Sequence, residues 1–381
     1  MQALQSWQNL NKHWGYNMAV TLNGTTGLVF NDGSSQNTAA TGFGFKNRII
    51  NGAMVIDQRN AGAVQTSPAS NTYGLDRWKV NVGGGGFNIQ QNAGAVTPPA
   101  GFSFYYGVTS TSTTTASNFS VRQLIEGFNF ADFGFGTANA QSVTLSFWVR
   151  SSLTGTFGGA IQNDVGTRSY VFSYTISSAN TWQQVTATVP GDTSGTWIGA
   201  TTGAGAVLYI SYSAAAAYAG AAGSWTANDY RTVTGQTNVL GTNGATFYVT
   251  GVQLEKGSTA TSFDYRPYGT ELQLCQRYYE KSYNMASIAG ASTNTNKGSF
   301  VTATGNVFWR WTQNYRVSKR ADSTFTIYST TGALGSVRLN NGSDLAVSTE
   351  DAGENATAVF VSRNATVGDF FWWQWTASAE L

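Results

Sequence analysis

Aromatic side chains at alternating positions are the residues of this sequence whose type and spacing could recognise a ligand. Trp309 and Trp311 in FWRW fall on one face of an expected strand, and FFWWQW (residues 370–375) carries aromatic rings on both faces. Indole rings can stack on the apolar faces of sugars, so we nominate Trp309, Trp311, Tyr315 and Trp372 as receptor- or glycan-binding residues. Burial of these rings is the alternative, and we favour it because aromatic residues dominate protein cores.

Catalytic chemistry has few candidates in this sequence. The single histidine, His13, and the single cysteine, Cys275, remove most metal sites and most nucleophilic triads. The 19 Asp and Glu residues include no motif that singles out the carboxylate pair, about 5–9 Å apart, required for glycoside hydrolysis. The one acidic cluster, Glu350, Asp351 and Glu354, lacks the ligand spacing of a calcium loop. We therefore predict a protein that is not an enzyme and that holds neither metal nor cofactor.

The composition limits the size of the protein and its partners. At 381 residues the chain is long enough for two or three domains of roughly 150 residues. A net charge of +2, without a concentrated basic face, argues against nucleic-acid binding. No run of about 20 apolar residues occurs, so membrane insertion is not expected. One cysteine forbids an intrachain disulfide and fits assembly in a reducing cytoplasm.

Short strands joined by tight turns must position the aromatic side chains. Only 10% of residues are charged, whereas 14% are aromatic and 44 are glycine. In residues 142–150 the side chains of Val143, Leu145, Phe147 and Val149 share one face. In residues 246–254 the same alternation places Phe247, Val249, Gly251 and Gln253 opposite Tyr248, Thr250, Val252 and Leu254. Period two over many short segments predicts an all-β fold: a β-sandwich of the jelly-roll type with a second, smaller C-terminal β domain.

Two segments have helical spacing instead. Residues 271–283 place Leu272, Cys275 and Tyr279 on one stripe, after Pro267 and Gly269 have ended the preceding strand. Near the N-terminus a short helix is expected, with Leu4, Trp7, Leu10 and Trp14 on its apolar face. So short a helix is marginal in water, so this stripe must bury against a partner.

The chain therefore divides into five predicted segments. They are an amphipathic anchoring segment (1–17), an extended linker (18–46), a jelly-roll β domain (47–268), a connecting helix (269–283) and a C-terminal β domain (284–381). No repeat with a period of 20–50 residues occurs, which argues against a parallel β-helix or a propeller.

Several sequence blocks resemble bacteriophage tail-fibre or receptor-binding proteins that carry a jelly roll like that of carbohydrate-binding modules. One of them is TGVQLEKGSTATSFDYRPYGTELQLCQRYYEKS, at residues 250–282, and its residues 253–281 are the most specific part of the resemblance. The others are GLVFNDGSSQNTAA (27–40), NRIINGAMVIDQRNAG (47–62), LDRW (75–78), LSFWVRSSLTGTFG (145–158), PGDTSGTW (190–197) and the closing TASAEL (376–381). Residues 1–17 are the part of the chain that departs from this pattern.

The resemblance implies a virion fibre protein, usually a homotrimer, that binds host-surface polysaccharide through its β domains. Residues 1–46 would attach it to other tail or capsid proteins, with Leu4, Trp7, Leu10 and Trp14 as the virion anchor. The expected location is the virion, after assembly in the host cytoplasm. Two alternatives stay open. One is a purely structural capsid or tail decoration subunit, and the other, which we favour less, is a polysaccharide-degrading tailspike.

Overall fold

The computed structural model describes residues 21–23, 27–29, 35–36, 45–113, 119–301, 308–362 and 368–381. The chain forms two compact units, Met1–Lys46 and Asn47–Leu381. In the first unit the strands β1 (Thr21–Asn23), β2 (Gly27–Val29) and β3 (Ser35–Gln36) pair antiparallel. The predicted N-terminal helix and its residues Leu4, Trp7, Leu10 and Trp14 lie outside the described residues.

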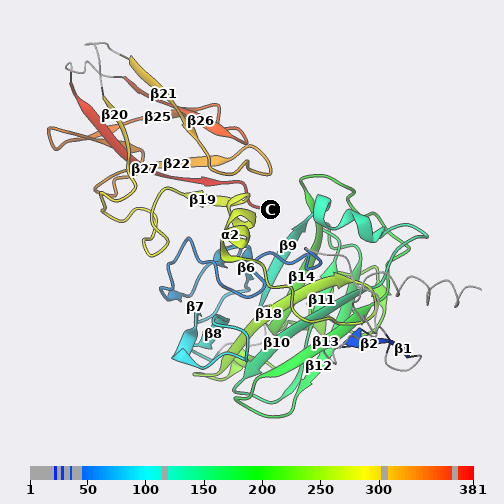
Figure 1. The fold of residues 1–381 in the computed structure, drawn as a ribbon. Coiled ribbons are helices and arrows are strands. Elements are labelled where there is room, and N and C mark those ends of the chain that lie inside the picture. Colours follow the sequence, from blue (N-terminus) through cyan, green and yellow to red (C-terminus); the bar gives the residue numbers. More distant parts are fainter. Residues whose placement is uncertain are drawn as a thin grey trace, which may run out of the picture. The chain divides into compact units, whose positions relative to one another are not determined.

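Two antiparallel sheets form the main β-sandwich (Figure 1). The first has the order β13-β10-β18-β8-β7-β4 and the second β16-β12-β11-β14-β9-β6-β5. The strands of the first sheet are β4 (Gln65–Thr66), β7 (Phe87–Gln91), β8 (Tyr106–Ser110), β10 (Val143–Ser151), β13 (Gln183–Val189) and β18 (Thr246–Lys256). Those of the second are β5 (Tyr73–Leu75), β6 (Trp78–Asn81), β9 (Phe119–Glu126), β11 (Gly155–Gln162), β12 (Ser169–Ile176), β14 (Ala204–Ser213) and β16 (Trp225–Thr226).

Short elements complete this part of the chain. A parallel pair, β15 (Ala219–Gly220) and β17 (Thr232–Val233), lies outside the two large sheets. The 3-10 helices are η1 (Ala93–Ala95), η2 (Gly127–Asn129), η3 (Ala131–Phe133), η4 (Ala216–Tyr218) and η5 (Val239–Gly241). In the described residues no helix is long and apolar enough to cross a bilayer.

Apolar residues at alternating positions of the strands pack between the two large sheets. The predicted inner face of β10, Val143, Leu145, Phe147 and Val149, is fully buried. Phe147 contacts Tyr174 of β12 with ring centroids 5.4 Å apart, and Phe157 of β11 stacks on Phe247 of β18 at 5.8 Å. Each such side chain stabilises the fold by roughly 1.5–3 kcal/mol through burial. The predicted all-β sandwich is confirmed.

A β-bulge in β18 corrects the predicted alternation of residues 246–254. The pairing of β18 with β10 shifts register between Ser146 and Trp148, and Gly251 takes a φ of +61° there. Beyond the bulge, Leu254 pairs with Leu145, and both side chains lie in the core. The inner face therefore holds Phe247, Val249, Val252 and Leu254, and the predicted grouping of Gly251 and Gln253 with Phe247 and Val249 was wrong.

A buried carboxylate ties two loops of the sandwich together. Asp192, 1% exposed, accepts hydrogen bonds from Arg168 Nε at 2.7 Å and from Arg168 Nη2 at 2.6 Å. Trp197 Nε1 donates to the same carboxylate at 3.1 Å. This paired arrangement allows the charge of Asp192 to be buried.

The connecting helix is shorter than predicted. Helix α2 spans Tyr268–Gln276, and the carbonyl oxygen of Pro267 accepts hydrogen bonds from the amides of Thr270 and Glu271 at its start. The predicted helix to residue 283 was wrong, because Tyr279–Lys281 forms β19 and pairs with the end of β27. Cys275 is buried on the helix, as its position on the predicted stripe indicated.

Two further sheets make up the C-terminal part of the chain. The larger contains β19 with β20 (Gly298–Val301), β22 (Thr324–Ser329), β23 (Ser336–Leu339), β24 (Asp344–Ala346) and β27 (Phe370–Ser378). The smaller contains β21 (Phe308–Asn314), β25 (Ser348–Glu350) and β26 (Ala356–Ser362). A cluster of aromatic and aliphatic side chains from both sheets, including Trp309, Val361, Phe371, Trp373 and Trp375, forms their core.

Buried charges link the residue pair between α2 and β19 and the residues after β27 to the main sandwich. Glu380 accepts hydrogen bonds from Arg59 Nη2 at 3.0 Å and from Arg77 Nη1. Asp76 lies 3.6 Å from Arg59 Nη1, and the Arg77 guanidinium lies 3.6 Å from the ring centroid of Tyr278. The side chains of Arg77 and Asp76 are 2% and 1% exposed, so these contacts are shielded from water.

Candidate functional site

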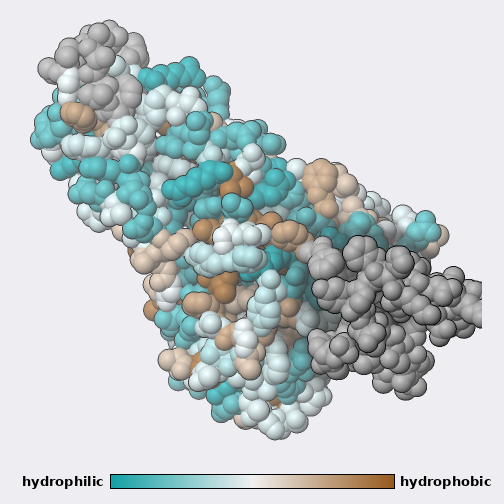
Figure 2. All heavy atoms as spheres, in the orientation of Figure 1, coloured by the Kyte–Doolittle hydropathy of each residue, from teal (hydrophilic) through white to brown (hydrophobic). Residues whose placement is uncertain are grey.

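A pocket of about 230 Å³ opens beside the start of α2. Hydrophobic patches gather around the level of this helix on the face seen in Figure 2, whereas the surface over the C-terminal sheets is mostly hydrophilic. Three segments line the pocket. They contribute Asn47, Gly52, Ala53 and Val55, then Gly101, Phe102, Ser103 and Phe104, and finally Phe263, Asp264, Tyr265, Arg266 and Glu271.

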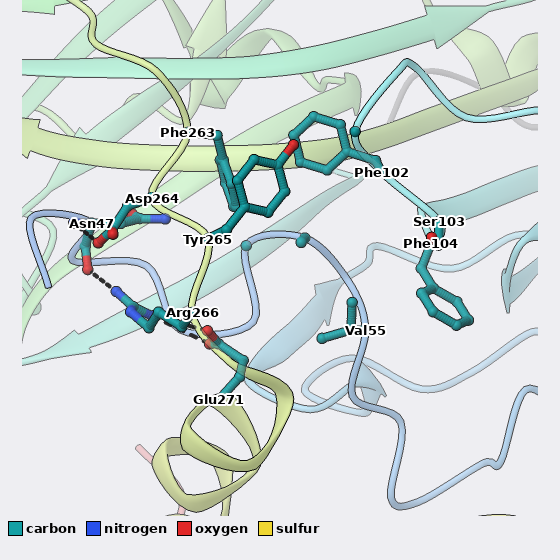
Figure 3. Close-up of a pocket in the computed structure, with 13 residues that line it drawn as sticks. Asn47, Val55, Phe102, Ser103, Phe104, Phe263, Asp264, Tyr265, Arg266 and Glu271 are labelled. Carbon is teal, nitrogen blue, oxygen red and sulfur yellow. Dashed lines mark hydrogen bonds and ion pairs between the residues drawn. The ribbon is translucent and has the colours of Figure 1, made fainter. Parts of the chain in front are cut away.

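Three aromatic rings form one wall of the pocket (Figure 3). The ring centroids of Phe263 and Tyr265 are 4.8 Å apart, and those of Phe102 and Phe263 are 5.1 Å apart, both in edge-to-face contact. Phe102 and Tyr265 are 5.5 Å apart with their planes tilted by 38°. Tyr265 is 55% exposed, so the cluster, packed on its inner side, offers an aromatic surface to a ligand.

Two glycines make room for this cluster. Gly251, at the bulge of β18, lies under Phe102: a Cβ there would stand 2.6 Å from Phe102 Cζ. Gly101 has a φ of +89°, and its Cβ would stand 2.5 Å from the hydroxyl oxygen of Tyr265. Both positions need a residue without a side chain, for backbone conformation as well as for space. The bulge therefore changes which face of β18 its side chains occupy, and its glycine leaves the space in which Phe102 packs.

The charged side chains of the pocket hold its walls together. Arg266 Nη1 donates to Ile49 O at 3.1 Å and to Glu271 Oε2 at 3.2 Å, and its Nη2 donates to Asn47 O. Asn47 N donates to Asp264 Oδ2 at 3.2 Å. The Arg266–Glu271 pair is 5% and 10% exposed, so its two charges neutralise each other inside the wall.

A second pocket of about 250 Å³ adjoins the first, and Val55 and Phe104 line both. Its other lining residues are Asp57, Ala61, Gln91, Tyr268, Met285 and Ala286. We call the two pockets together the aromatic groove. Tyr268, 53% exposed, lines the second pocket as Tyr265 lines the first. The groove therefore has one half-exposed tyrosine in each of its two parts.

Burial shifts the pKa of three groups of the groove, Tyr265, Tyr268 and Asp57, upward. Burial raises the pKa of the Tyr265 and Tyr268 hydroxyls, so both stay protonated and can donate hydrogen bonds at neutral pH. Burial also raises the pKa of Asp57, whose carboxylate accepts the amides of Asn60 at 2.9 Å and Gly62 at 2.8 Å. The groove thus combines apolar rings with hydroxyl, amide and carboxylate groups, a lining suited to a polar, uncharged ligand.

The residues nominated from the sequence lie elsewhere and do not form one site. Trp309 is 9% exposed and belongs to the C-terminal core, and Trp311 packs on Trp373 with centroids 4.7 Å apart. Tyr315 packs on Trp375 at 5.8 Å. Trp372 instead lies on the face of β27 that is turned away from this core, beside the exposed ring of Phe370.

The aromatic groove was missed because its residues are far apart in the sequence. Phe102 lies in a loop before β8, and Phe263 and Tyr265 lie between β18 and α2. The alternation of Phe263 and Tyr265 just before Pro267 was a usable signal for an exposed aromatic pair. Nothing in the sequence indicated that Phe102 would meet them.

The acidic cluster lies at the end of β25 and in the connection to β26, and it is exposed to solvent. Arg310 Nη2 lies 3.6 Å from Glu350 and 3.5 Å from Asp351, and all three side chains are well exposed. Within the described ranges, no three His, Cys, Asp or Glu side chains are grouped as they would be to hold a metal ion.

Comparison with known proteins yields distant structural likeness only. No family model matches the sequence, and no curated protein matches it. Among solved structures, the enzymatically active domain of bacteriophage CBA120 tailspike protein 4 is 11% identical at a TM-score of 0.30, covering 56% of this chain and 22% of that one. A putative sugar-binding protein from Bacteroides thetaiotaomicron is 12% identical at a TM-score of 0.30, covering 55% of this chain and all of that one.

The tandem carbohydrate-binding modules CBM22-1 and CBM22-2 of Paenibacillus barcinonensis are also similar. They are 8% identical at a TM-score of 0.26, covering 84% of this chain and 99% of that one. This chain thus spans about a fifth of the tailspike domain and nearly the full length of the tandem modules. The likeness to carbohydrate-binding modules is one of structure, without a sequence family.

Proposed function

We propose that this protein binds carbohydrate in the aromatic groove. The observation that carries the proposal is the cluster of Phe102, Phe263 and Tyr265, which is packed from within and half exposed at Tyr265. Such a ring can stack on the C–H face of a pyranose, while the hydroxyls of Ser103 and Tyr268 and the carboxylate of Asp264 are placed to bind its hydroxyl groups. Because the groove has two parts, we propose a linear oligosaccharide rather than a single sugar.

We further propose that this binding serves a bacteriophage virion fibre, which attaches through residues 1–46 and adheres to host-surface polysaccharide. The sequence blocks that resemble tail-fibre proteins support this role, and TSFDYRP, which contains Phe263, Tyr265 and Arg266, lies within the most specific of them. A homotrimer located in the virion is part of the same proposal. Light scattering of the purified full chain would test the trimer, and a monomeric mass would contradict it.

We propose that the protein recognises polysaccharide without cleaving it. Glu271 is paired with Arg266, Asp57 accepts two main-chain amides and Asp264 accepts the amide of Asn47, so all three carboxylates of the groove hold the fold. Release of reducing ends from host polysaccharide by the wild-type protein, and its loss in Asp264→Asn, would instead establish a degrading tailspike. A subunit that occurs on particles but binds no polysaccharide would be a decoration protein.

The groove is tested by comparing two half-exposed aromatic residues. Tyr265→Ala removes a ring that is 55% exposed inside the groove, and Phe128→Ala removes one that is 57% exposed outside it. We expect purified wild-type protein to bind envelope polysaccharide on a glycan array. Tyr265→Ala should raise the Kd about tenfold, the equivalent of 1.4 kcal/mol, and Phe128→Ala should leave it unchanged. Equal affinity of the two variants would refute the assignment of the groove.

The anchor is tested on particles. Trp7→Ala or Trp14→Ala should abolish incorporation of the protein into virions while its β-sheets stay folded. The amount of protein per purified particle is the measurement, and circular dichroism of the isolated variant is the control for folding. Normal incorporation of either variant would show that these indole rings are not the anchor.

A further inference from the structure

A second aromatic surface lies on the outer face of β27, away from the groove. The side chains of β27 alternate: Phe371, Trp373 and Trp375 are buried in the C-terminal core, whereas Phe370 is 42% exposed. The rings of Phe370 and Trp372 have centroids 6.2 Å apart and planes only 14° apart. The two rings therefore lie nearly parallel on the outer face of β27, and we call this pair of rings the β27 platform.

A positive charge is fixed on this platform. Lys297 Nζ lies 4.1 Å from the ring centroid of Trp372, in the geometry of a cation–π contact. In the part of the chain that the structure describes, no carboxylate lies within ion-pair distance of Lys297. The ammonium group is therefore held in place by the indole ring and not by an opposite charge, so it can pair with an anionic ligand.

Hydrogen-bonding groups flank the platform on the neighbouring strands. Trp372 pairs with Ser299 of β20 and with Arg338 of β23, and residues that pair directly share a face of the sheet. Ser299 is exposed, and Arg338 Nη1 donates to Asp344 Oδ1 at 3.1 Å. Across β20, β27 and β23, this face thus presents the Ser299 hydroxyl, then the Trp372 indole with the Lys297 ammonium, and then the Arg338–Asp344 ion pair.

We propose that the β27 platform binds an acidic saccharide, with its ring stacked on Phe370 and Trp372 and its carboxylate paired with Lys297. The site is separate from the aromatic groove, whose lining carries no unpaired cation of this kind, and it takes a different class of sugar. A nucleic acid would need several cations along its phosphates, whereas on this face Arg338 is already paired and Lys297 is the one cation left among the described residues. One negative charge per ring, as in a uronic acid, matches one ammonium beside one platform.

The test uses the full-length protein with polymannuronate as the acidic probe and dextran as the neutral one. We expect the wild type to bind polymannuronate in affinity electrophoresis at 50 mM NaCl, and more weakly at 500 mM. Lys297→Gln should weaken this binding about fivefold, the value of one exposed ion pair. Phe370→Ala should weaken it about tenfold through loss of stacking. Thermal melting curves would establish that both variants stay folded.

Matched controls separate this site from general electrostatics and from the groove. Lys256→Gln removes the same charge from an exposed lysine of the main sandwich and should leave polymannuronate binding unchanged. Tyr265→Ala, in the groove, should also leave it unchanged. Equal losses in Lys297→Gln and Lys256→Gln, or equal binding of dextran and polymannuronate, would overturn the proposal. Loss of binding in Tyr265→Ala but not in Phe370→Ala would overturn it too, and would leave the groove as the carbohydrate site.

Discussion

Replacing Glu380 by Gln should destabilise the fold by about 3 kcal/mol. Glu380 is 9% exposed at its side chain and accepts hydrogen bonds from two buried guanidinium groups, those of Arg59 and Arg77. Removing one partner of a buried ion pair costs about 3–5 kcal/mol, because the remaining charge stays buried without compensation. Glutamine keeps one acceptor oxygen for the two guanidinium groups, so we expect the lower end of that range.

Urea denaturation followed by tryptophan fluorescence measures this loss, with Asp344→Asn as the control. The Arg338–Asp344 pair has a similar distance, 3.1 Å, but its side chains are 28% and 26% exposed, so its loss should cost about 1 kcal/mol or less. Although burial opposes it, the charges of Arg77 and Arg59 hold the pKa of Glu380 below its usual range. The stabilisation is therefore present at neutral pH and disappears as the pH falls through this lowered pKa. A loss at pH 7 no larger than that of Asp344→Asn would refute the reasoning.

Three further changes test other buried features. Burial raises the pKa of Asp76 to about 7, so its neutral form stabilises the fold, and this contribution is lost as the pH rises through 7. Between pH 5.5 and 8, urea denaturation should show the wild type losing on the order of 2 kcal/mol relative to Asp76→Asn, and parallel pH profiles would contradict this. Gly251→Ala should destabilise the protein by about 1–3 kcal/mol and weaken saccharide binding, whereas Gly244→Ala, with φ +80° but open space, should affect stability alone. Asp192→Ala should lower the free energy of unfolding by about 2–3 kcal/mol, and Asp132→Ala, 47% exposed, by less than about 1 kcal/mol; similar losses would mean that burial of the Asp192 pair is unimportant.

Strand periodicity predicted the sandwich well where a strand is regular and one face is buried. The alternation in β10 identified all four inner residues, because a one-residue slip would have exposed every one of them. In β18 the same reasoning failed after Val249, because the bulge at Gly251 inserts a residue and reverses the faces. A glycine inside an alternating strand is itself a sign of a bulge, and it was available in the sequence.

The end of α2 and the site were harder to predict for a different reason. Helical spacing continues through residues 277–283, yet Tyr279 and Lys281 pair with β27, almost a hundred residues further on. A segment that adds a strand to a sheet is stabilised more by its inter-strand hydrogen bonds and by burial than it would be by local helix propensity. The groove depends on a similar distant contact, between Phe102 and Phe263. Such contacts follow from the topology of the fold, and the sequence near either residue does not indicate them.

The buried charges also explain how the groove keeps its shape in a chain with so few ionisable residues. Met285 and Ala286, which line the second pocket, belong to the segment after β19. Lys281 Nζ fixes that segment by donating to Met285 O at 3.2 Å and to Ser287 O at 2.6 Å.

The neighbouring Glu280 and Lys319 pair at 2.6 Å with no exposure, and Arg59 lies over the ring of Tyr279 at 3.7 Å. Apolar contacts alone would allow β19 and the following loop to slide, because they are not directional. Hydrogen-bonded charges are directional, and here they hold one wall of the groove relative to the other. On this reasoning, the residues that determine the affinity for the saccharide that we propose include charged groups that never touch it.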